Sequence, residues 1–93
     1  MLKTEQKQWH TVRAGQSVKE IARFYSVSER LLVKRNALQA QPHIGQILEI
    51  PCEKGNVYTV KAGDTKGALC GSEERFERLN GTKIFYIGMQ VII

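Results

Sequence analysis

Thr-Val-Arg-Ala-Gly-Gln-Ser, at residues 11–17, returns as Thr-Val-Lys-Ala-Gly-Asp-Thr at residues 59–65. Each copy is followed by an Asn and then by an Ile-Gly pair that opens a run of alternating apolar residues, at 44–50 and at 87–93. An internal repeat of this kind indicates that the chain consists of two small units of one architecture. The function of the chain is therefore expected to be the function of that unit.

The second copy is a trimmed version of the first. From the Gly of the opening motif to the following Asn, the stretch from Gly63 to Asn80 is four residues shorter than the stretch from Gly15 to Asn36. Alignment of the copies leaves residues 23–26 without a counterpart, which is about one turn of helix at roughly 3.6 residues per turn. A shortened first helix is therefore predicted for the second unit.

Within each unit the residue pattern predicts the order strand, helix, helix, strand. β-branched and aromatic residues at 9–13 and 57–61 stop at Ala-Gly, as short strands do, and the closing segments 47–50 and 90–93 are predicted to pair with them. The predicted fold class is α+β: two small βααβ units in tandem, each with a two-stranded antiparallel sheet packed on two short helices. The expected boundaries are a flexible N-terminus at 1–8, a first unit at 9–51, a linker at 52–56 and a shortened second unit at 57–93.

Serine and threonine residues mark the predicted helix starts. Ser17 and Glu20 have the spacing of a capping box, in which the hydroxyl and the carboxylate each satisfy an amide at the helix start. Ser28 is placed to cap the second helix, and Thr65 and Ser72 take the corresponding positions in the second unit. The Asn that follows the second helix of each unit is predicted to end that helix.

Size and composition restrict the possible functions. The 93 residues carry 14 Lys and Arg against 9 Asp and Glu, which gives a net charge of +5. This charge suits either an anionic partner or an ordinary solvated surface. Cys70 is interpreted as a small buried thiol and Cys52 as a linker thiol, in preference to a bridge between them. Two Cys and two His this far apart in sequence predict no metal site, and no cofactor is expected.

The sequence does not predict an enzyme or a membrane protein. Paired carboxylates, and a nucleophile beside a base, are absent at recognisable spacing. No segment resembles a signal peptide or a membrane span, so membrane insertion is not expected and the compartment stays open.

The residues of the first copy resemble the LysM domain. They match its pattern at Val12, Gly15, Ser17, Ile21, Ala22, Tyr25, Val27, Ser28, Leu32, Asn36, Gly45, Gln46, Leu48, Ile50 and Pro51. The second copy repeats the opening of the pattern at residues 58–65 and the end of its second helix at residues 79–81. The resemblance covers about residues 9–93, so the chain is similar to a tandem LysM protein.

The resemblance implies a non-catalytic module that binds N-acetylglucosamine-containing glycans, either bacterial peptidoglycan or chitin-type oligosaccharides. The family's site is a shallow groove between the first strand–helix loop and the loop before the closing strand. Carried over to this sequence, the candidate glycan-binding residues are Gly15, Gln16, Ser17, Val18, Gln41, Pro42, His43 and Ile44 in the first unit, and Gly63, Asp64, Thr65, Lys66, Ile84, Phe85, Tyr86 and Ile87 in the second. Exposed amides at a helix start suit sugar oxygens, and an apolar wall suits the N-acetyl methyl.

Some residues depart from the family pattern or permit two interpretations. Gln16, in the first unit, stands where the family has Asp. In the second unit Lys66 stands where the family prefers Leu and a helical turn is missing, which leaves two alternatives: this unit binds glycan, or it only buttresses the first. Asp64 either binds ligand or is a structural cap at the start of the following helix, and His43 either contacts sugar or is merely exposed. Of Phe85 and Tyr86, one is expected in the core and the other in a stacking platform.

Two alternative functions come from other classes. One is a structural or assembly module of the spore-coat or phage-tail type, with protein partners and weak glycan binding, so that the cell wall or a spore or phage assembly is the suggested location. The other is DNA binding by a helix-turn-helix at residues 17–35, whose second helix is basic. The flanking strands and the missing turn of the second copy argue against nucleic acid as a partner.

Overall fold

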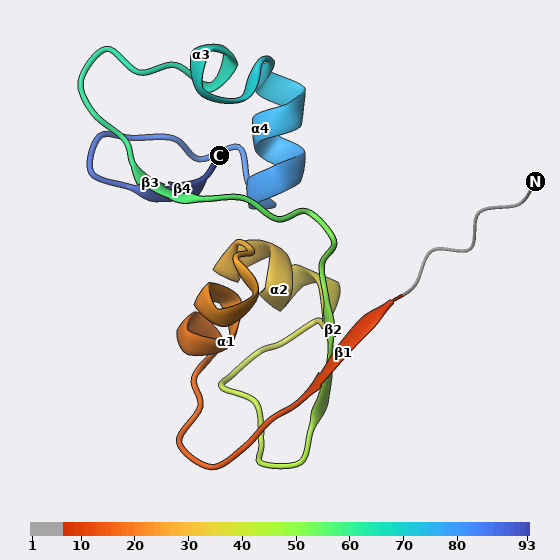
Figure 1. The fold of residues 1–93 in the computed structure, drawn as a ribbon. Coiled ribbons are helices and arrows are strands. Elements are labelled where there is room, and N and C mark those ends of the chain that lie inside the picture. The colour runs from red at the N-terminus through yellow and green to blue at the C-terminus, as the bar shows by residue number, and fades with distance from the viewer. Residues whose placement is uncertain (1–6) are drawn as a thin grey trace, which may run out of the picture.

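The structure is a computed structural model and describes residues 7–93 (Figure 1). The first unit comprises β1 (Gln8–Thr11), α1 (Val18–Tyr25), α2 (Glu29–Arg35) and β2 (Ile47–Ile50). The second comprises β3 (Val57–Thr59), α3 (Lys66–Cys70), α4 (Glu73–Asn80) and β4 (Gln90–Ile92). The predicted α+β class and the order strand, helix, helix, strand are confirmed. Of the predicted flexible N-terminus, residues 1–6 lie outside the described residues, whereas Gln8 already belongs to β1.

Each unit has its own two-stranded antiparallel sheet. β1 pairs with β2 so that Trp9 faces Glu49, and β3 pairs with β4 so that Tyr58 faces Val91. No hydrogen bond joins the two sheets into one in the described chain. The opening and closing segments of each repeat therefore meet, as predicted from their alternating residues.

Side-chain caps begin all four helices at the predicted positions. The hydroxyls of Ser17, Ser28, Thr65 and Ser72 each accept a hydrogen bond from an amide in the first turn of the following helix. The second half of the predicted capping box is wrong, because the Glu20 carboxylate accepts from the Ser17 hydroxyl at 3.2 Å. α1 has 8 residues and α3 has 5, so the first helix of the second unit is shortened as predicted.

Each sheet and its helices enclose a separate hydrophobic core. The first core gathers Val12, Val18, Ile21, Ala22, Val27, Leu32, Leu48 and Ile50. The second is smaller and gathers Val60, Phe76, Met89 and Val91, with half-buried Cys70 and Phe85 packed against it. At about 25 cal/mol per Å² of buried apolar surface, the second core contributes less to stability than the first. The second unit therefore depends more on what it docks against.

The Asn that ends the second helix of each unit also joins that helix to the closing strand. The Asn80 amide nitrogen donates to the carbonyls of Phe76 and Ile92, both at 3.0 Å, and its oxygen accepts from the Ile92 amide at 2.7 Å. Asn36 makes the same three bonds to Leu32 and Glu49. One side chain thus holds helix and strand together in both units.

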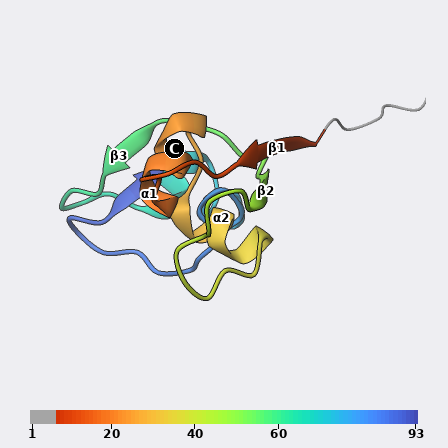
Figure 2. The ribbon, with the colours of Figure 1, turned by 90° about the horizontal axis from the view of Figure 1, so that it is seen from below.

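The two units dock through α2 and α4. The Ser28 hydroxyl, which caps α2, donates to the carbonyl of Asn80 at 2.8 Å in a buried position. Lys34 donates to the carbonyl of Gly81 at 3.2 Å, and Gly81 lies so close to Leu31 that a Cβ would come within 3.0 Å of its backbone. Seen from below, the first unit overlaps the second, so the units are stacked (Figure 2).

Two properties of residues 7–93 bear on the classes of function. No helix there is long and apolar enough to cross a membrane. Within residues 7–93, no three His, Cys, Asp or Glu side chains gather where they could hold a metal ion.

Candidate glycan-binding site

The two loops predicted to form the groove of the first unit lie side by side. The Val12 amide donates to the Gln46 carbonyl at 2.9 Å, and the Gly45 amide donates to the Val12 carbonyl at 2.8 Å. These bonds extend the β1–β2 pairing beyond the last strand residues into the loops. The predicted segments 15–18 and 41–44 are therefore brought together at one end of the sheet.

Each of these loops is a tight turn whose third residue is glycine. The Gln16 amide closes one turn on the Arg13 carbonyl at 3.2 Å, and the Gln46 amide closes the other on the His43 carbonyl at 3.0 Å. Gly15 has φ +81° and Gly45 has φ +87°, the left-handed region that this type of turn requires of its third residue. The conformation of the turn is thus a sufficient reason for glycine at both positions.

Gln16 stabilises its loop from within. Its Oε1 accepts from the Arg13 amide at 2.9 Å and lies 2.9 Å from Nε2 of His10. Because an amide oxygen only accepts, His10 donates from Nε2, and its Nδ1 then accepts from the Tyr25 hydroxyl at 2.8 Å. His10 and Tyr25 were not among the predicted site residues, although they position one of them.

Asp64 does the same in the second unit. Its Oδ2 accepts from the Lys61 amide and from the Tyr58 hydroxyl, both at 2.7 Å. The pKa of the Asp64 carboxyl is lowered, chiefly by the Lys61 amide and then by Tyr58. The pKa of Tyr58 is raised, chiefly because its hydroxyl donates to Asp64. The predicted capping role of Asp64 is wrong, because Thr65 caps α3 and the Asp64 carboxylate bonds within its own loop.

A side chain also bridges the two loops of the first unit. Oε1 of Gln41 accepts from the Val18 amide at 2.9 Å. The Val18 side chain is 6% exposed and belongs to the core, so it offers no surface to a ligand, contrary to its inclusion among the candidates. The bond between Val18 and Gln41 thus holds the two loops at a fixed distance from each other.

The remaining candidates of the first unit lie at the surface of these two loops or close beneath it. Ile44 is 73% exposed at the tip of its turn, His43 is exposed and Pro42 is half-buried. The Ser17 hydroxyl is used in capping. In the described chain no acceptor pairs with the backbone amides of Gly15 and Ser17. The first loop therefore has two backbone amides without an acceptor in the described chain, and the second loop has an exposed apolar side chain.

In the second unit a lysine spans the corresponding place. Nζ of Lys66 donates to the carbonyl of Lys83 at 2.6 Å and lies 3.0 Å from Glu77. The Lys66 side chain is only 15% exposed and its Nζ lies 5.8 Å from the centre of the Phe76 ring. Lys66 thus connects the two loops of the second unit, as Gln41 does in the first unit. The longer Lys66 side chain lies between the loops.

The other candidates of the second unit are distributed differently from the prediction. Gly63, Thr65, Ile84 and Ile87 are exposed in their loops, with Ile87 68% exposed. Phe85 is half-buried and packs edge-on against Phe76, with ring centres 5.2 Å apart. Tyr86 is exposed but lines a cavity between the two units. One aromatic side chain is thus in the core, as expected, while the other lies at a place that the sequence did not indicate.

The paired loops lie at one end of a βααβ scaffold. Residues 10–51, which make up most of the first unit, match the family model described as LysM domain. LysM domains are binding modules rather than catalytic ones, and they bind N-acetylglucosamine-containing glycans such as peptidoglycan.

Two solved structures are similar to this chain. The spore cortex-lytic enzyme SleL of Bacillus megaterium QM B1551 has 33% sequence identity and a TM-score of 0.48, over 94% of this chain and 22% of that chain. The spore cortex-lytic enzyme SleL of Bacillus cereus has 28% identity and a TM-score of 0.47, over 95% of this chain and 23% of that chain. The chain thus spans less than a quarter of either enzyme. No curated protein matches it in sequence.

Proposed function

We propose that this chain is a non-catalytic module that binds bacterial peptidoglycan through the groove of its first unit. The observation that carries the proposal is the pairing of two loops by Gln41, which leaves Ile44 73% exposed opposite the turn at Gly15. The Ile44 side chain is thus held at the tip of a fixed turn, where it is available to cover an apolar group of a ligand.

The chemistry of the groove suits an N-acetylated sugar. The acetamide of N-acetylglucosamine has a carbonyl oxygen that accepts hydrogen bonds and a methyl group that prefers an apolar contact. The free amides of Gly15 and Ser17 are donors for that oxygen, and Ile44 covers the methyl. A chitin-type oligosaccharide presents the same group, so the groove is proposed to accept both polymers.

We propose that residues 57–93 form a second, shortened LysM-like unit, joined to the first at 9–51 by a linker at 52–56. Three features that the two units have in common support this proposal: the side-chain caps of the helices, the Asn at the end of the second helix, and the turn that Asp64 stabilises as Gln16 does in the first unit. Because Lys66 occupies the space between its loops, the second unit is proposed to buttress the first rather than to bind glycan.

The helix-turn-helix alternative fits the structure poorly. A recognition helix enters the major groove at its N-terminal end. Here that end of α2 is docked on the second unit, because buried Ser28 is bonded to Asn80 and Leu31 packs against Gly81. The structural or assembly module would use the same βααβ fold as a glycan-binding module. Experiment therefore has to distinguish these two functions.

The test is an amide NMR titration of the whole chain with N-acetylglucosamine tetrasaccharide and, separately, with a soluble peptidoglycan fragment. Shifts are expected at residues 15–18 and 41–44. Ile44→Ser is expected to raise Kd about tenfold, which corresponds to roughly 1.4 kcal/mol of lost apolar contact. Gly15 is a poor probe, because any side chain is strained at its φ of +81°.

The matched control is Ile47→Ser. Ile47 is 62% exposed, and its neighbour Leu48 is in the core, so Ile47 lies on the solvent side of β2. Kd should be unchanged in this variant. Equal losses in the two variants would remove the groove from the proposal, and an absence of shifts with either glycan at millimolar concentration would favour the assembly module.

A further inference from the structure

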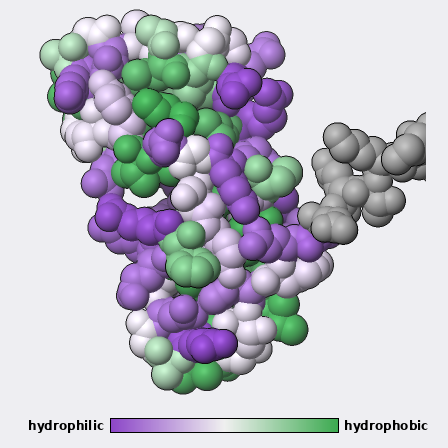
Figure 3. Space-filling view, in the orientation of Figure 1, coloured by the Kyte–Doolittle hydropathy of each residue, from purple (hydrophilic) through white to green (hydrophobic). Residues whose placement is uncertain are grey.

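A second cavity lies between the two units, away from the proposed groove. It has a volume of about 410 Å³, within the usual range for small-ligand sites. Its floor is apolar and buried, with Ala22 and Val27 from the first unit and Met89 and Val91 from the second. The space-filling view shows a hollow between the units with hydrophilic side chains beside it (Figure 3).

Three cations line this cavity, all from the first unit. Lys19 and Arg23 stand four residues apart on α1, and Arg30 stands in the first turn of α2. None of the three forms an ion pair within residues 7–93. Like charges at this helical spacing destabilise an isolated helix. Their shared position at one cavity therefore favours an anion that binds there.

The acidic and neutral groups of the rim leave the cavity positive. Glu29 is its one lining carboxylate, and Arg23 donates to the neutral Gln90 side chain at 2.7 Å. The side chains of Lys19 and Arg30 make no hydrogen bond in the described chain and are exposed. Two cationic side chains thus remain available to a ligand oxygen.

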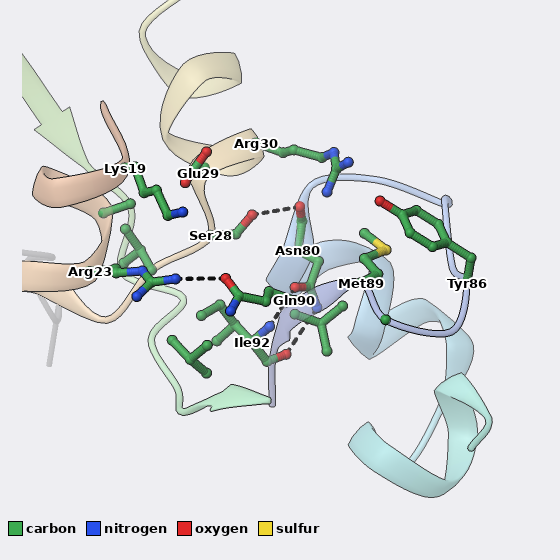
Figure 4. Close-up of a pocket in the computed structure, with 15 residues that line it drawn as sticks. Lys19, Arg23, Ser28, Glu29, Arg30, Asn80, Tyr86, Met89, Gln90 and Ile92 are labelled. Atoms are coloured by element: carbon green, nitrogen blue, oxygen red, sulfur yellow. Dashed lines mark hydrogen bonds between the residues drawn. The ribbon is translucent and has the colours of Figure 1, made fainter. Parts of the chain in front are cut away.

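The other side of the cavity provides an aromatic surface. Tyr86, from the loop before β4, is 54% exposed and lines the cavity. Figure 4 shows Arg30 extending from α2 toward Tyr86, with Lys19 and Arg23 on the far side of the Ser28–Asn80 bond. A pyranose ring has one apolar face of C–H groups, which packs on an aromatic side chain. A positively charged rim opposite an exposed aromatic ring is therefore suited to a sugar that carries an acidic group.

The docking of the units fixes the shape of the cavity. The Ser28–Asn80 hydrogen bond lies at its floor, and the close approach of Gly81 to Leu31 holds α4 against α2. Because neither unit alone provides both the cations and the tyrosine, the site exists only in the tandem chain. A preformed site requires little ordering when a ligand binds.

We propose that this inter-unit cavity, lined by Lys19, Arg23, Arg30 and Tyr86, binds a carboxylate-bearing sugar. The carboxylate interacts with Arg30 and the sugar ring packs on Tyr86, while Lys19 and Arg23 add positive charge at the rim. This site is separate from the groove of the proposed function and does not depend on it.

The test compares two disaccharides by amide NMR titration of the whole chain. One is N-acetylglucosaminyl-N-acetylmuramic acid, which carries a carboxylate, and the other is N,N′-diacetylchitobiose, which is neutral. The acidic disaccharide is expected to shift residues 23–30 and 86–91, whereas the neutral one should shift only residues 15–18 and 41–44. Arg30→Gln should weaken acidic-disaccharide binding at the cavity about tenfold, since a charge-assisted hydrogen bond is lost.

Three further variants sharpen the test. Glu29→Gln should tighten binding about twofold, because it removes the nearest like charge. Tyr86→Phe should bind as the parent does, while Tyr86→Ala should bind several-fold more weakly, on the order of the loss of one ring contact. Arg78→Gln is the matched control, because Arg78 is exposed on α4 outside the cavity and its loss lowers the net charge equally.

Each outcome bears on one site alone. Equal weakening by Arg30→Gln and Arg78→Gln, or equal cavity shifts with inorganic phosphate at the same concentration, would show general attraction of anions and overturn the proposal. Cavity shifts with the neutral disaccharide would also overturn it. Loss of the groove shifts with cavity shifts retained would refute the proposed function and leave this inference standing.

Discussion

Replacement of Asn80 by Ala should destabilise the chain by about 3 kcal/mol. Asn80 is 3% exposed and makes three hydrogen bonds, each of which contributes about 1 kcal/mol to stability. The variant also leaves the amide and carbonyl of Ile92 without partners, and Ile92 is 5% exposed, so water does not replace them readily. Since domains of this size are stable by about 5–15 kcal/mol, the loss is a large fraction of the total.

The measurement is urea unfolding followed by circular dichroism, with the free energy of unfolding extrapolated to water. The internal comparison is Asn36→Ala, which removes the same three bonds from a half-buried position. Because water can reach that site, we expect a smaller loss of about 1–2 kcal/mol. Arg78→Ala, exposed on the same helix as Asn80, should change stability by less than about 0.5 kcal/mol. Equal losses at Asn36 and Asn80 would contradict the reasoning from burial.

Three further predictions concern the loops. Gln16→Ala should lower the free energy of unfolding by about 1 kcal/mol, whereas Gln16→Asp should retain the bond from the Arg13 amide; urea unfolding of both variants checks this. The pKa of Asp64 lies below its unfolded value of 3.8, so its stabilising effect is complete above pH 3.8 and is lost as the pH falls through the folded-state pKa. Carboxyl NMR titration should show that Tyr58→Phe raises the pKa of Asp64, and an unchanged midpoint would contradict the bond between them. Lys66→Val should open the second groove, so glycan titration of that variant should produce shifts in the second unit's loops that the parent lacks.

Local features of the fold were predictable from sequence because their causes are local. A hydroxyl at the start of a helix bonds an amide three residues on, so Ser17, Ser28, Thr65 and Ser72 could be identified as caps. The shortened α3 followed from the missing turn in the repeat. Pairing of β1 with β2 followed from the alternation of their residues.

The sequence indicated which segments of the chain form the candidate glycan-binding site, but not what each side chain in those segments does. Sequence placed two loops together but did not distinguish the role of Val18, whose side chain turns into the core, from that of Ile44, whose side chain stays exposed. The reach of Lys66 across its unit depends on side-chain contacts with residues 11 and 17 positions away. Gln16 in place of Asp was identified as a departure, yet both residues accept the same amide hydrogen bond, which only the three-dimensional turn reveals.

The inter-unit cavity had no sequence signal. Lys19, Arg23 and Arg30 are separated from Tyr86 by more than half the chain, and their meeting depends on how the units dock. The bond from Ser28 to Asn80 that fixes this docking joins a side chain to a backbone carbonyl. Any residue at position 80 has such a carbonyl, so no residue type there indicates the contact.

The rigid docking of α2 on α4 determines how many polymer strands one molecule can hold, and in which direction. In Figure 1 the loop end of the first unit points to the bottom of the view, and the loop end of the second unit points to the upper left. A straight strand that enters one groove therefore does not continue into the other. Under the proposed function only one of the two grooves receives a long polymer. A variant with an open second groove would then crosslink neighbouring strands, because one straight strand does not reach both grooves.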